Sequence, residues 1–282
     1  MTPATVEQNP DRLCLLSSAL RQTPANVVAE RAAEAGFGSI EWGIGPAEAS
    51  NGTPAEAESL RELSAAHGLS IAGVCVQGGP ASLEEPSTIR PVATFAAELG
   101  APFLRVWAPA YRGGSIASEL DRARGLVSRA IEITDMLGVV LLVENAPDSL
   151  APSTTLAREL LEGQDPGAVG VLFDPANGLI EGRLDARLAI ADLGPYLHHV
   201  HVKNIAWTRE DETWSWRYAA LAEGMLDWPD TLAALGASGY EGLLSFDHLV
   251  CEPTVAGLRE SADALRALVA ETSPPAPTGS PR

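Results

Sequence analysis

Short apolar runs alternate along the chain with longer segments in which apolar residues recur at helical spacing. The short runs are rich in Val, Leu and Ile and show little polar alternation, which is typical of parallel strands buried on both faces. Eight strands are predicted at residues 13–16, 39–42, 71–76, 103–107, 139–144, 169–174, 200–203 and 243–247.

The segments between these strands carry helix start and stop signals. Thr23 and Thr53 each place a capping hydroxyl before a proline, and glycines such as Gly100 and Gly138 follow helical segments. Helices are predicted at residues 24–36, 54–67, 89–99, 116–137, from 153 onward, and at 184–193, 228–235 and 254–270. Strand–helix alternation repeated eight times favours a single-domain α/β protein, a (β/α)8 TIM barrel over residues 1–272. A doubly wound sheet is disfavoured because no glycine-rich nucleotide loop follows the first strand.

The length and composition fit one globular domain. The 282 residues are 46% hydrophobic, and the net charge of −18 would repel nucleic acid phosphates. Three widely spaced cysteines indicate neither a disulfide framework nor a zinc knuckle. No signal peptide or membrane-spanning run is evident, so we expect a soluble cytoplasmic protein with no membrane partner. The Pro-, Ser- and Thr-rich residues 273–282 are expected to form a disordered tail.

The predicted strands end in residues that suit a metal site. In the strand around residues 200–203, the side chains of His201 and Lys203 point to one face. His198 points to the opposite face and is expected to be a packed core residue. Glu144, Asp174 and Asp247 end three further strands, and the C-terminal ends of barrel strands meet at one mouth. Buried carboxylates are costly unless they are paired or bind metal. With His201 they suit one divalent ion such as Mn²⁺, Mg²⁺, Co²⁺ or Zn²⁺.

Four spaced segments carry a family resemblance: VEN at 143–145, FDPAN at 173–177, HVHVKN at 199–204 and GYEGLLSFD at 239–247. LAEGMLDW at 221–228 resembles a further Gly-Glu-Gly-x-x-Asp-Trp stretch of the same family. Together they resemble the sugar phosphate isomerase/epimerase family, in the xylose-isomerase-like TIM barrel superfamily. The resemblance spans essentially the whole barrel and is not specific for one substrate.

The resemblance implies a metal-dependent isomerase or epimerase. Glu144, Asp174, His201 and Asp247 would be the metal ligands, and Glu144 and Asp247 would exchange the proton beside the carbonyl of a small sugar or polyol-derived ketone. The reaction would pass through a metal-stabilised enediolate. Two positions depart from the family pattern: Asp247 replaces a glutamate found in many members, and Asn177 replaces a histidine.

Several further residues are predicted to contact substrate. The expected contacts are Lys203, Asn177, Glu41, Arg105, Trp107 and Gln77. Lys203 would polarise a carbonyl or hold an anionic group, or form a salt bridge at the rim. The long connection 204–227 is expected to be a lid or binding loop, or else a surface hairpin. Trp42 on the second predicted strand, and Trp207 and Trp216 in this connection, would stack on a sugar or pack against the barrel.

The sequence leaves the reaction type open. An inosose-type dehydratase would use the same ligands, and a non-catalytic sugar-binding barrel fits the two departures. A nuclease of the endonuclease IV type is disfavoured by the few histidines and the negative charge. A homodimer is compatible with the Trp-rich loops.

Overall fold

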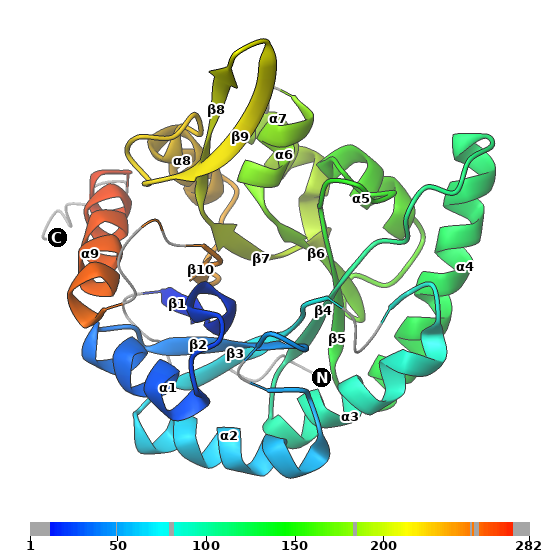
Figure 1. The fold of residues 1–282 in the computed structure, drawn as a ribbon. Coiled ribbons are helices and arrows are strands. Elements are labelled where there is room, and N and C mark those ends of the chain that lie inside the picture. The colour runs from blue at the N-terminus through cyan, green and yellow to red at the C-terminus, as the bar shows by residue number, and fades with distance from the viewer. Residues whose placement is uncertain are drawn as a thin grey trace, which may run out of the picture.

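Eight parallel strands close into a barrel in the computed structural model of the chain (Figure 1). The structure describes residues 12–48, 50–78, 82–182, 185–248, 250 and 254–272. Around the barrel the strands follow the order β1-β10-β7-β6-β5-β4-β3-β2. The strands are β1 (Leu13–Leu16), β2 (Ser39–Ile44), β3 (Ser70–Val76), β4 (Phe103–Trp107), β5 (Val140–Glu144), β6 (Val169–Phe173), β7 (Leu197–Val202) and β10 (Leu244–Phe246). The predicted TIM barrel is confirmed.

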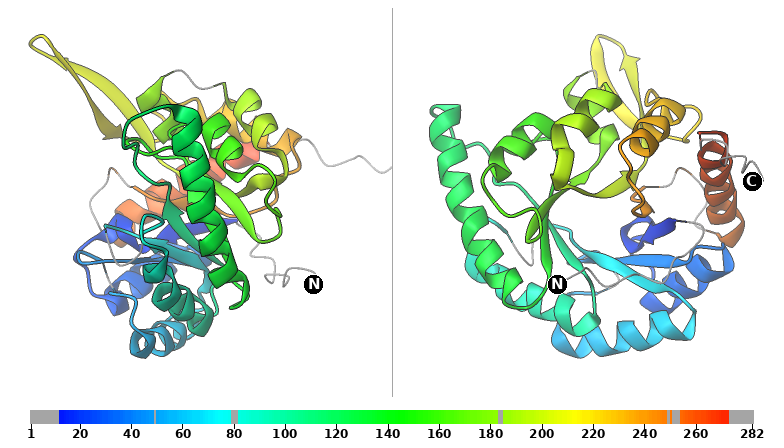
Figure 2. Two further views of the ribbon diagram at one scale, coloured as in Figure 1. Left: turned by 90° about the vertical axis from the view of Figure 1, so that its right-hand side faces the viewer. Right: turned by 180° about the vertical axis from the view of Figure 1, so that it is seen from behind.

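An outer ring of helices covers the barrel, and the right-hand view in Figure 2 shows it from behind. The helices are α1 (Ala25–Glu34), α2 (Pro54–Ala66), α3 (Ile89–Leu99), α4 (Ile116–Asp135), α5 (Thr154–Leu161), α6 (Pro175–Glu181), α7 (Ala186–Leu193), α8 (Trp228–Ala237) and α9 (Val255–Thr272). Thr53 and Glu56 form a reciprocal capping box at the start of α2, as the Thr-Pro signal predicts. Helix α6 is an addition that the sequence pattern does not predict.

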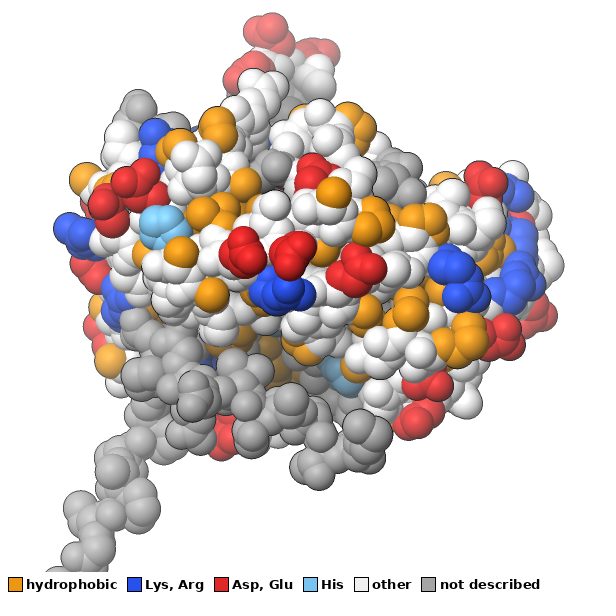
Figure 3. Space-filling model, turned by 90° about the horizontal axis from the view of Figure 1, so that it is seen from below, with side chains coloured by type: hydrophobic (Ala, Val, Ile, Leu, Met, Phe, Trp, Pro, Cys, Tyr) orange, Lys and Arg blue, Asp and Glu red, His pale blue; other side chains and the backbone are white. Residues whose placement is uncertain are grey.

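The apolar residues form two separate packing regions. The larger one lies between the strands and the helices and contains the outward-facing Val200 and Val202. A smaller cluster consists of Leu16, Cys75, Phe103, Leu142 and Leu172, with Val140 beside it. Gly73 makes room for it, because a Cβ there would lie 2.2 Å from the Phe103 ring. On the face in Figure 3, acidic and basic side chains intermingle with apolar ones, as on a solvated surface.

The long connection after β7 forms a two-stranded antiparallel hairpin of β8 (Asn204–Glu210) and β9 (Thr213–Ala219). It projects away from the barrel in the left-hand view of Figure 2. The segment is therefore a hairpin, and two of its residues, Trp216 and Tyr218, line the cavity described below. No helix within the described ranges is long and apolar enough to cross a membrane. The predicted tail, 273–282, lies outside the described residues.

Candidate metal centre and active site

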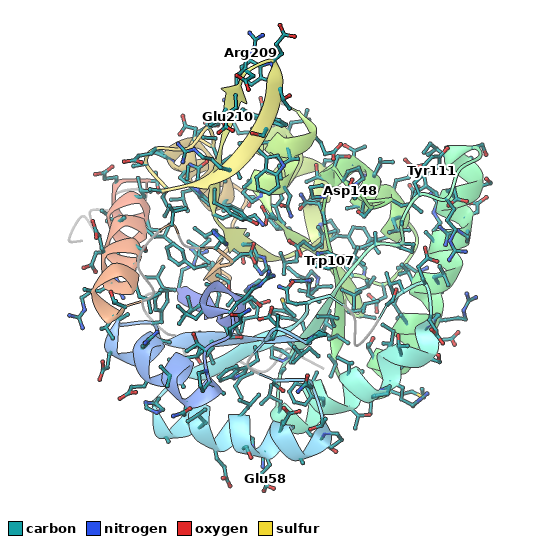
Figure 4. The ribbon with its side chains drawn as sticks, in the orientation of Figure 1. Glu58, Trp107, Tyr111, Asp148, Arg209 and Glu210 are labelled. Carbon is teal, nitrogen blue, oxygen red and sulfur yellow. The ribbon has the colours of Figure 1, made fainter. Side chains whose placement is uncertain are left out.

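A cavity of about 650 Å³ opens at the end of the barrel where the strands terminate. Figure 4 shows Trp107 at this mouth, while Arg209 and Glu210 lie at the far tip of the hairpin. The cavity wall includes residues from several strand ends and from the hairpin: Gln77, Arg105, Trp107, Glu144, Asn177, Lys203, Trp216, Tyr218, Asp247 and His248. Its position matches the active-site end of TIM barrels.

Glu144, Asp174 and His201 converge in the barrel, and Glu144 also lines this cavity. They are buried, and one ligand atom from each lies within 4.8 Å of the others. Nδ1 of His201 lies 3.8 Å from Oε1 of Glu144 and 4.0 Å from Oδ1 of Asp247. This nitrogen is buried and has no hydrogen-bond partner. All four residues predicted as metal ligands are thus brought together.

Glu144 is held in place by one ion pair and two hydrogen bonds. Nε of Arg105 lies 3.1 Å from Oε2 of Glu144, and Nε1 of Trp107 donates to the same oxygen at 2.9 Å. Nδ2 of Asn177 donates to Oε1 at 3.1 Å. Because β4 pairs with β5 so that Trp107 stands beside Glu144, the sheet register itself sets this contact. The carboxylate is therefore fixed as an oriented anion.

Asp174 has a different role for each of its oxygens. Oδ1 accepts a hydrogen bond from the backbone N–H of Asn177 at 2.9 Å and so caps α6. Oδ2 lies 2.7 Å from Nζ of Lys203. Asn145 locks the same corner, since its amide donates to the Asp174 carbonyl at 2.7 Å and accepts from the Asp174 N–H at 2.8 Å. One aspartate thus starts a helix and serves the site.

Lys203 is the only lysine in the chain, and it bridges two of the predicted ligands. Its Nζ lies 2.7 Å from Oδ2 of Asp174 and 2.6 Å from Oδ2 of Asp247. Burial would lower the pKa of Lys203, but the two carboxylates raise it well above its usual range. Burial would likewise raise the pKa of Asp247, yet the Lys203 and His201 charges hold it well below its usual value. The site therefore contains an internal cation.

His201 lies between carboxylates on both of its ring nitrogens. Burial alone would lower its pKa, whereas Glu41, Asp247 and Glu144 raise it to about 9. The metal-free imidazole is therefore protonated at neutral pH, and a metal at Nδ1 would replace a proton.

The structure places Glu41 away from the cavity at which the substrate contacts are predicted. Glu41 is the third residue of β2, which runs on to Ile44, beyond the predicted strand end at residue 42. Its side chain is fully buried and is absent from the cavity wall. It lies beside His199 and His201 inside the barrel, with Nε2 of each ring 3.3 Å and 3.2 Å from Oε2. The register shift between Ile40 and Glu41 in the β2–β3 pairing is not readable from the sequence.

The other predicted substrate contacts lie at the cavity. Gln77, Arg105, Trp107, Asn177 and Lys203 all belong to its wall. Arg105 is buried and also donates to the Val76 carbonyl at 2.6 Å, whereas Trp107 is 42% exposed and thus available to a ligand.

The predicted aromatic contacts divide between the core and the hairpin. Trp42 is fully buried, and its indole donates to Ser64 of α2 at 3.2 Å, so its predicted stacking on a sugar is wrong. Trp216 pairs with Trp207 across the hairpin and reaches the cavity wall. Tyr218 and its stacked partner His248 also line the cavity, and the sequence reading missed both. The period-two spacing of Trp214, Trp216 and Tyr218 is the signal by which Tyr218 could have been placed on the same hairpin face as Trp216.

The segment after the hairpin fixes the end of β7. Asn204 accepts from the Leu226 N–H at 2.9 Å and donates to its carbonyl at 3.0 Å. A Cβ at Gly224 would lie 2.0 Å from the Asn204 side chain, so only glycine fits there. The indole of Trp228 donates to the Lys203 carbonyl at 3.1 Å. The Gly-x-x-Asp-Trp spacing therefore positions Lys203.

The donor set fits a divalent cation. The carboxylates of Glu144 and Asp174 and the imidazole of His201 have ligand atoms within 4.8 Å of one another, and Oδ1 of Asp247 lies 4.0 Å from the same ring. The unpartnered Nδ1 of His201 is the lone-pair site that a metal would use after the proton leaves. A second group, Glu41, His199 and His201, also has ligand atoms within 4.8 Å of one another.

Comparison with known proteins identifies the family. Residues 29–268 match the model of the xylose isomerase-like TIM barrel family, and the chain belongs to that family. No curated protein sequence matches the chain.

Solved structures share the whole barrel at low sequence identity. A D-tagatose 3-epimerase-like protein has a TM-score of 0.75 and 18% identity, covering 92% of this chain and 97% of the other. The 3-keto-D-glucoside 4-epimerase of E. coli has a TM-score of 0.72 and 17% identity over 91% and 99%. A xylose isomerase-like barrel from Mycobacterium smegmatis in complex with magnesium has a TM-score of 0.66 and 17% identity over 93% and 97%. These likenesses show a common fold.

Proposed function

We propose that this chain is a divalent-metal-dependent isomerase or epimerase of a small sugar or hydroxy-ketone, with an enediolate as the intermediate. The observation that carries the proposal is the buried, unpartnered Nδ1 of His201, which faces Glu144 and Asp247. Glu144, Asp174, His201 and Asp247 would hold the ion. The epimerases among the similar structures support the reaction class, and the magnesium-bound barrel supports the metal.

The bound ion would supply Lewis-acid assistance to the oxygens of a hydroxy-ketone. The protein would supply the proton transfer. Asp247 is the better placed carrier of the proton, because its side chain lines the cavity and its Oδ1 lies 4.0 Å from Nδ1 of His201, beyond hydrogen-bond distance. Glu144 also reaches the cavity, but its oxygens are already engaged by Arg105, Trp107 and Asn177. We assign it the complementary transfer on the other side of the substrate.

Charge at the cavity wall favours an anionic intermediate. Lys203 and Arg105 both line the cavity, and each places a cation beside the carboxylates. Fixed cations of this kind stabilise the negative charge that develops on oxygen when a proton leaves the neighbouring carbon. Trp107 and Trp216 offer ring faces for the apolar side of a sugar.

The test combines metal content with proton exchange. The wild-type protein is loaded with Mn²⁺, dialysed, assayed for metal and incubated with a panel of ketoses and inososes in D₂O. We expect about one ion per chain and deuterium at the carbon beside the carbonyl. His201→Ala should abolish both, while His198→Ala, a change in the adjacent histidine on the other strand face, should preserve both.

Each alternative has its own outcome in this experiment. A product lighter by one water would identify a dehydratase. Metal retention with no exchange on any substrate would favour a binding protein. Absence of metal from the reloaded wild type would refute the proposal.

A further inference from the structure

A buried carboxylate lies behind the predicted metal ligand His201. Oε2 and Oε1 of Glu41 lie 3.2 Å and 3.4 Å from Nε2 of His201, on the ring edge opposite the free Nδ1. Both side chains are completely buried. The two nitrogens of one imidazole therefore face different groups, Glu41 on one side and the proposed metal ligands on the other.

We propose that Glu41 is the positioning residue for His201. Its carboxylate accepts a hydrogen bond from Nε2–H of His201, which leaves the lone pair of the neutral ring on Nδ1 and aims that lone pair at the metal. The inference rests on the proposed metal-dependent function. Carboxylate–histidine–metal arrangements of this type orient the ring and raise its basicity as a ligand.

The surroundings of Glu41 show that it is held as an oriented anion. Ser245 donates to its Oε2 at 2.7 Å, His199 lies 3.3 Å from the same oxygen, and the Cys75 thiol donates to Oε1. A buried carboxylate is costly unless such donors satisfy it. Glu41 therefore has a complete hydrogen-bond shell without a metal of its own.

This shell argues against a second ion at Glu41, His199 and His201. A metal there would require Nε2 of His201 to lose its proton, so that one ring would bridge two ions as an anion. It would also displace the serine and thiol donors from the carboxylate. Hydrogen bonds account for the distances of 3.2–3.4 Å between the histidine Nε2 atoms and the Glu41 oxygens, and they require no such deprotonation.

The test measures Mn²⁺ binding to the full chain by the electron paramagnetic resonance signal of the free ion. We compare wild type, Glu41→Gln and Ser245→Ala. Ser245→Ala is the matched control, because it removes another hydrogen bond to Glu41 but leaves the contact with His201. We expect one ion per chain throughout, with an affinity about 10–100-fold weaker in Glu41→Gln. Ser245→Ala should remain within about threefold of the wild type, well below that range.

A second measurement follows the hydrogen bond directly. In ¹⁵N-histidine-labelled protein loaded with diamagnetic Mg²⁺, His201 should show a protonated Nε2 with a downfield proton and an Nδ1 without a proton. The signal is assigned by its loss in His201→Asn. It should move upfield in Glu41→Gln and stay in Ser245→Ala. If Glu41→Gln does not fold, the wild-type spectrum alone decides the protonation pattern.

The outcomes separate this inference from the proposed function. Equal Mn²⁺ affinity in wild type and Glu41→Gln, or a protonated Nδ1 in the loaded protein, would overturn the positioning role alone. Two ions in the wild type and one in Glu41→Gln would show instead that Glu41 is itself a ligand. No binding by the wild type would refute the proposed metal site.

Discussion

Replacement of Lys203 by methionine tests whether the only lysine acts as the cation of the metal-free site. Its Nζ lies 2.7 Å from Asp174 and 2.6 Å from Asp247, and the side chain is 6% exposed. Methionine keeps the unbranched shape and removes the charge, so that both carboxylates lose their ammonium partner. Breaking a buried ion pair on one side costs about 3–5 kcal/mol.

Two results are expected: a loss of stability in the metal-free variant, and tighter metal binding because the ion replaces the missing ammonium charge. For a chain of this size, about 1 kcal/mol corresponds to a Tm shift of roughly 2–4 °C, so the metal-free variant should melt roughly 6–20 °C below wild type. A divalent ion would restore the missing positive charge. Two charges about 4 Å apart at an effective dielectric constant of about 20 interact by about 4 kcal/mol. Without the competing ammonium, the variant should bind metal at least about tenfold more tightly, an effect of only about 1.4 kcal/mol.

The assay is thermal unfolding with and without saturating Mn²⁺, together with a binding titration. Arg112→Met is the matched control, because it also removes a cation from an ion pair, but Arg112 is 60% exposed at its bridge with Glu84. A surface pair of that kind contributes about 0–1 kcal/mol. The reasoning is wrong if Lys203→Met melts like the wild type in the absence of metal. It is equally wrong if the rise in Tm on adding Mn²⁺ is the same in both proteins.

Three further predictions use the same site. The pKa of the metal-free His201 is raised to about 9, so the ring carries a proton below pH 9. Because the metal must replace this proton, the affinity for Mn²⁺ should fall about tenfold per pH unit from pH 9 toward pH 6.5 in a chelator-competition titration. The same raised pKa stabilises the metal-free fold fully below pH 6.5, and up to about 3 kcal/mol should be lost by pH 9 in urea unfolding. An amine-directed reagent can modify only one side chain, Lys203. Asp247→Asn removes a carboxylate that raises the pKa of Lys203, so mass spectrometry should show this modification accelerated about tenfold or more in that variant.

Much of the fold was predictable because barrel strands and helices have local signatures. The strands Leu13–Leu16 and Phe103–Trp107 and the helix Ile89–Leu99 occur with the predicted bounds. Helix α6 was missed because it is only seven residues long and starts at Pro175, directly after the predicted strand, whose last residue, Asp174, serves as its N-cap. For the connection 204–227, a hairpin was only one of two alternatives. Its alternating aromatic residues are largely exposed, so they do not give the apolar pattern of a strand packed against the core.

The site residues that could be predicted are those whose direction follows from the alternation of side chains along a strand. His201 and Lys203 face inward as the alternation requires, and Glu144 and Asp247 reach the same mouth because parallel strands end together. The position of Glu41 could not be predicted in this way, since its strand extends beyond the apolar run and the β2–β3 register shifts beside it.

The arrangement of charge within the site was beyond the sequence for a physical reason. Residue type shows that Lys203 is a cation and Asp174 and Asp247 are anions, but only the closed barrel brings β6, β7 and β10 side by side. In that geometry the same two carboxylates that suit a divalent ion are already neutralised by an ammonium. Metal binding at the proposed site would therefore be an exchange of cations, in which the ion would displace Lys203 from at least one carboxylate and a proton from His201. Its affinity would be set by that exchange as much as by the ligands themselves.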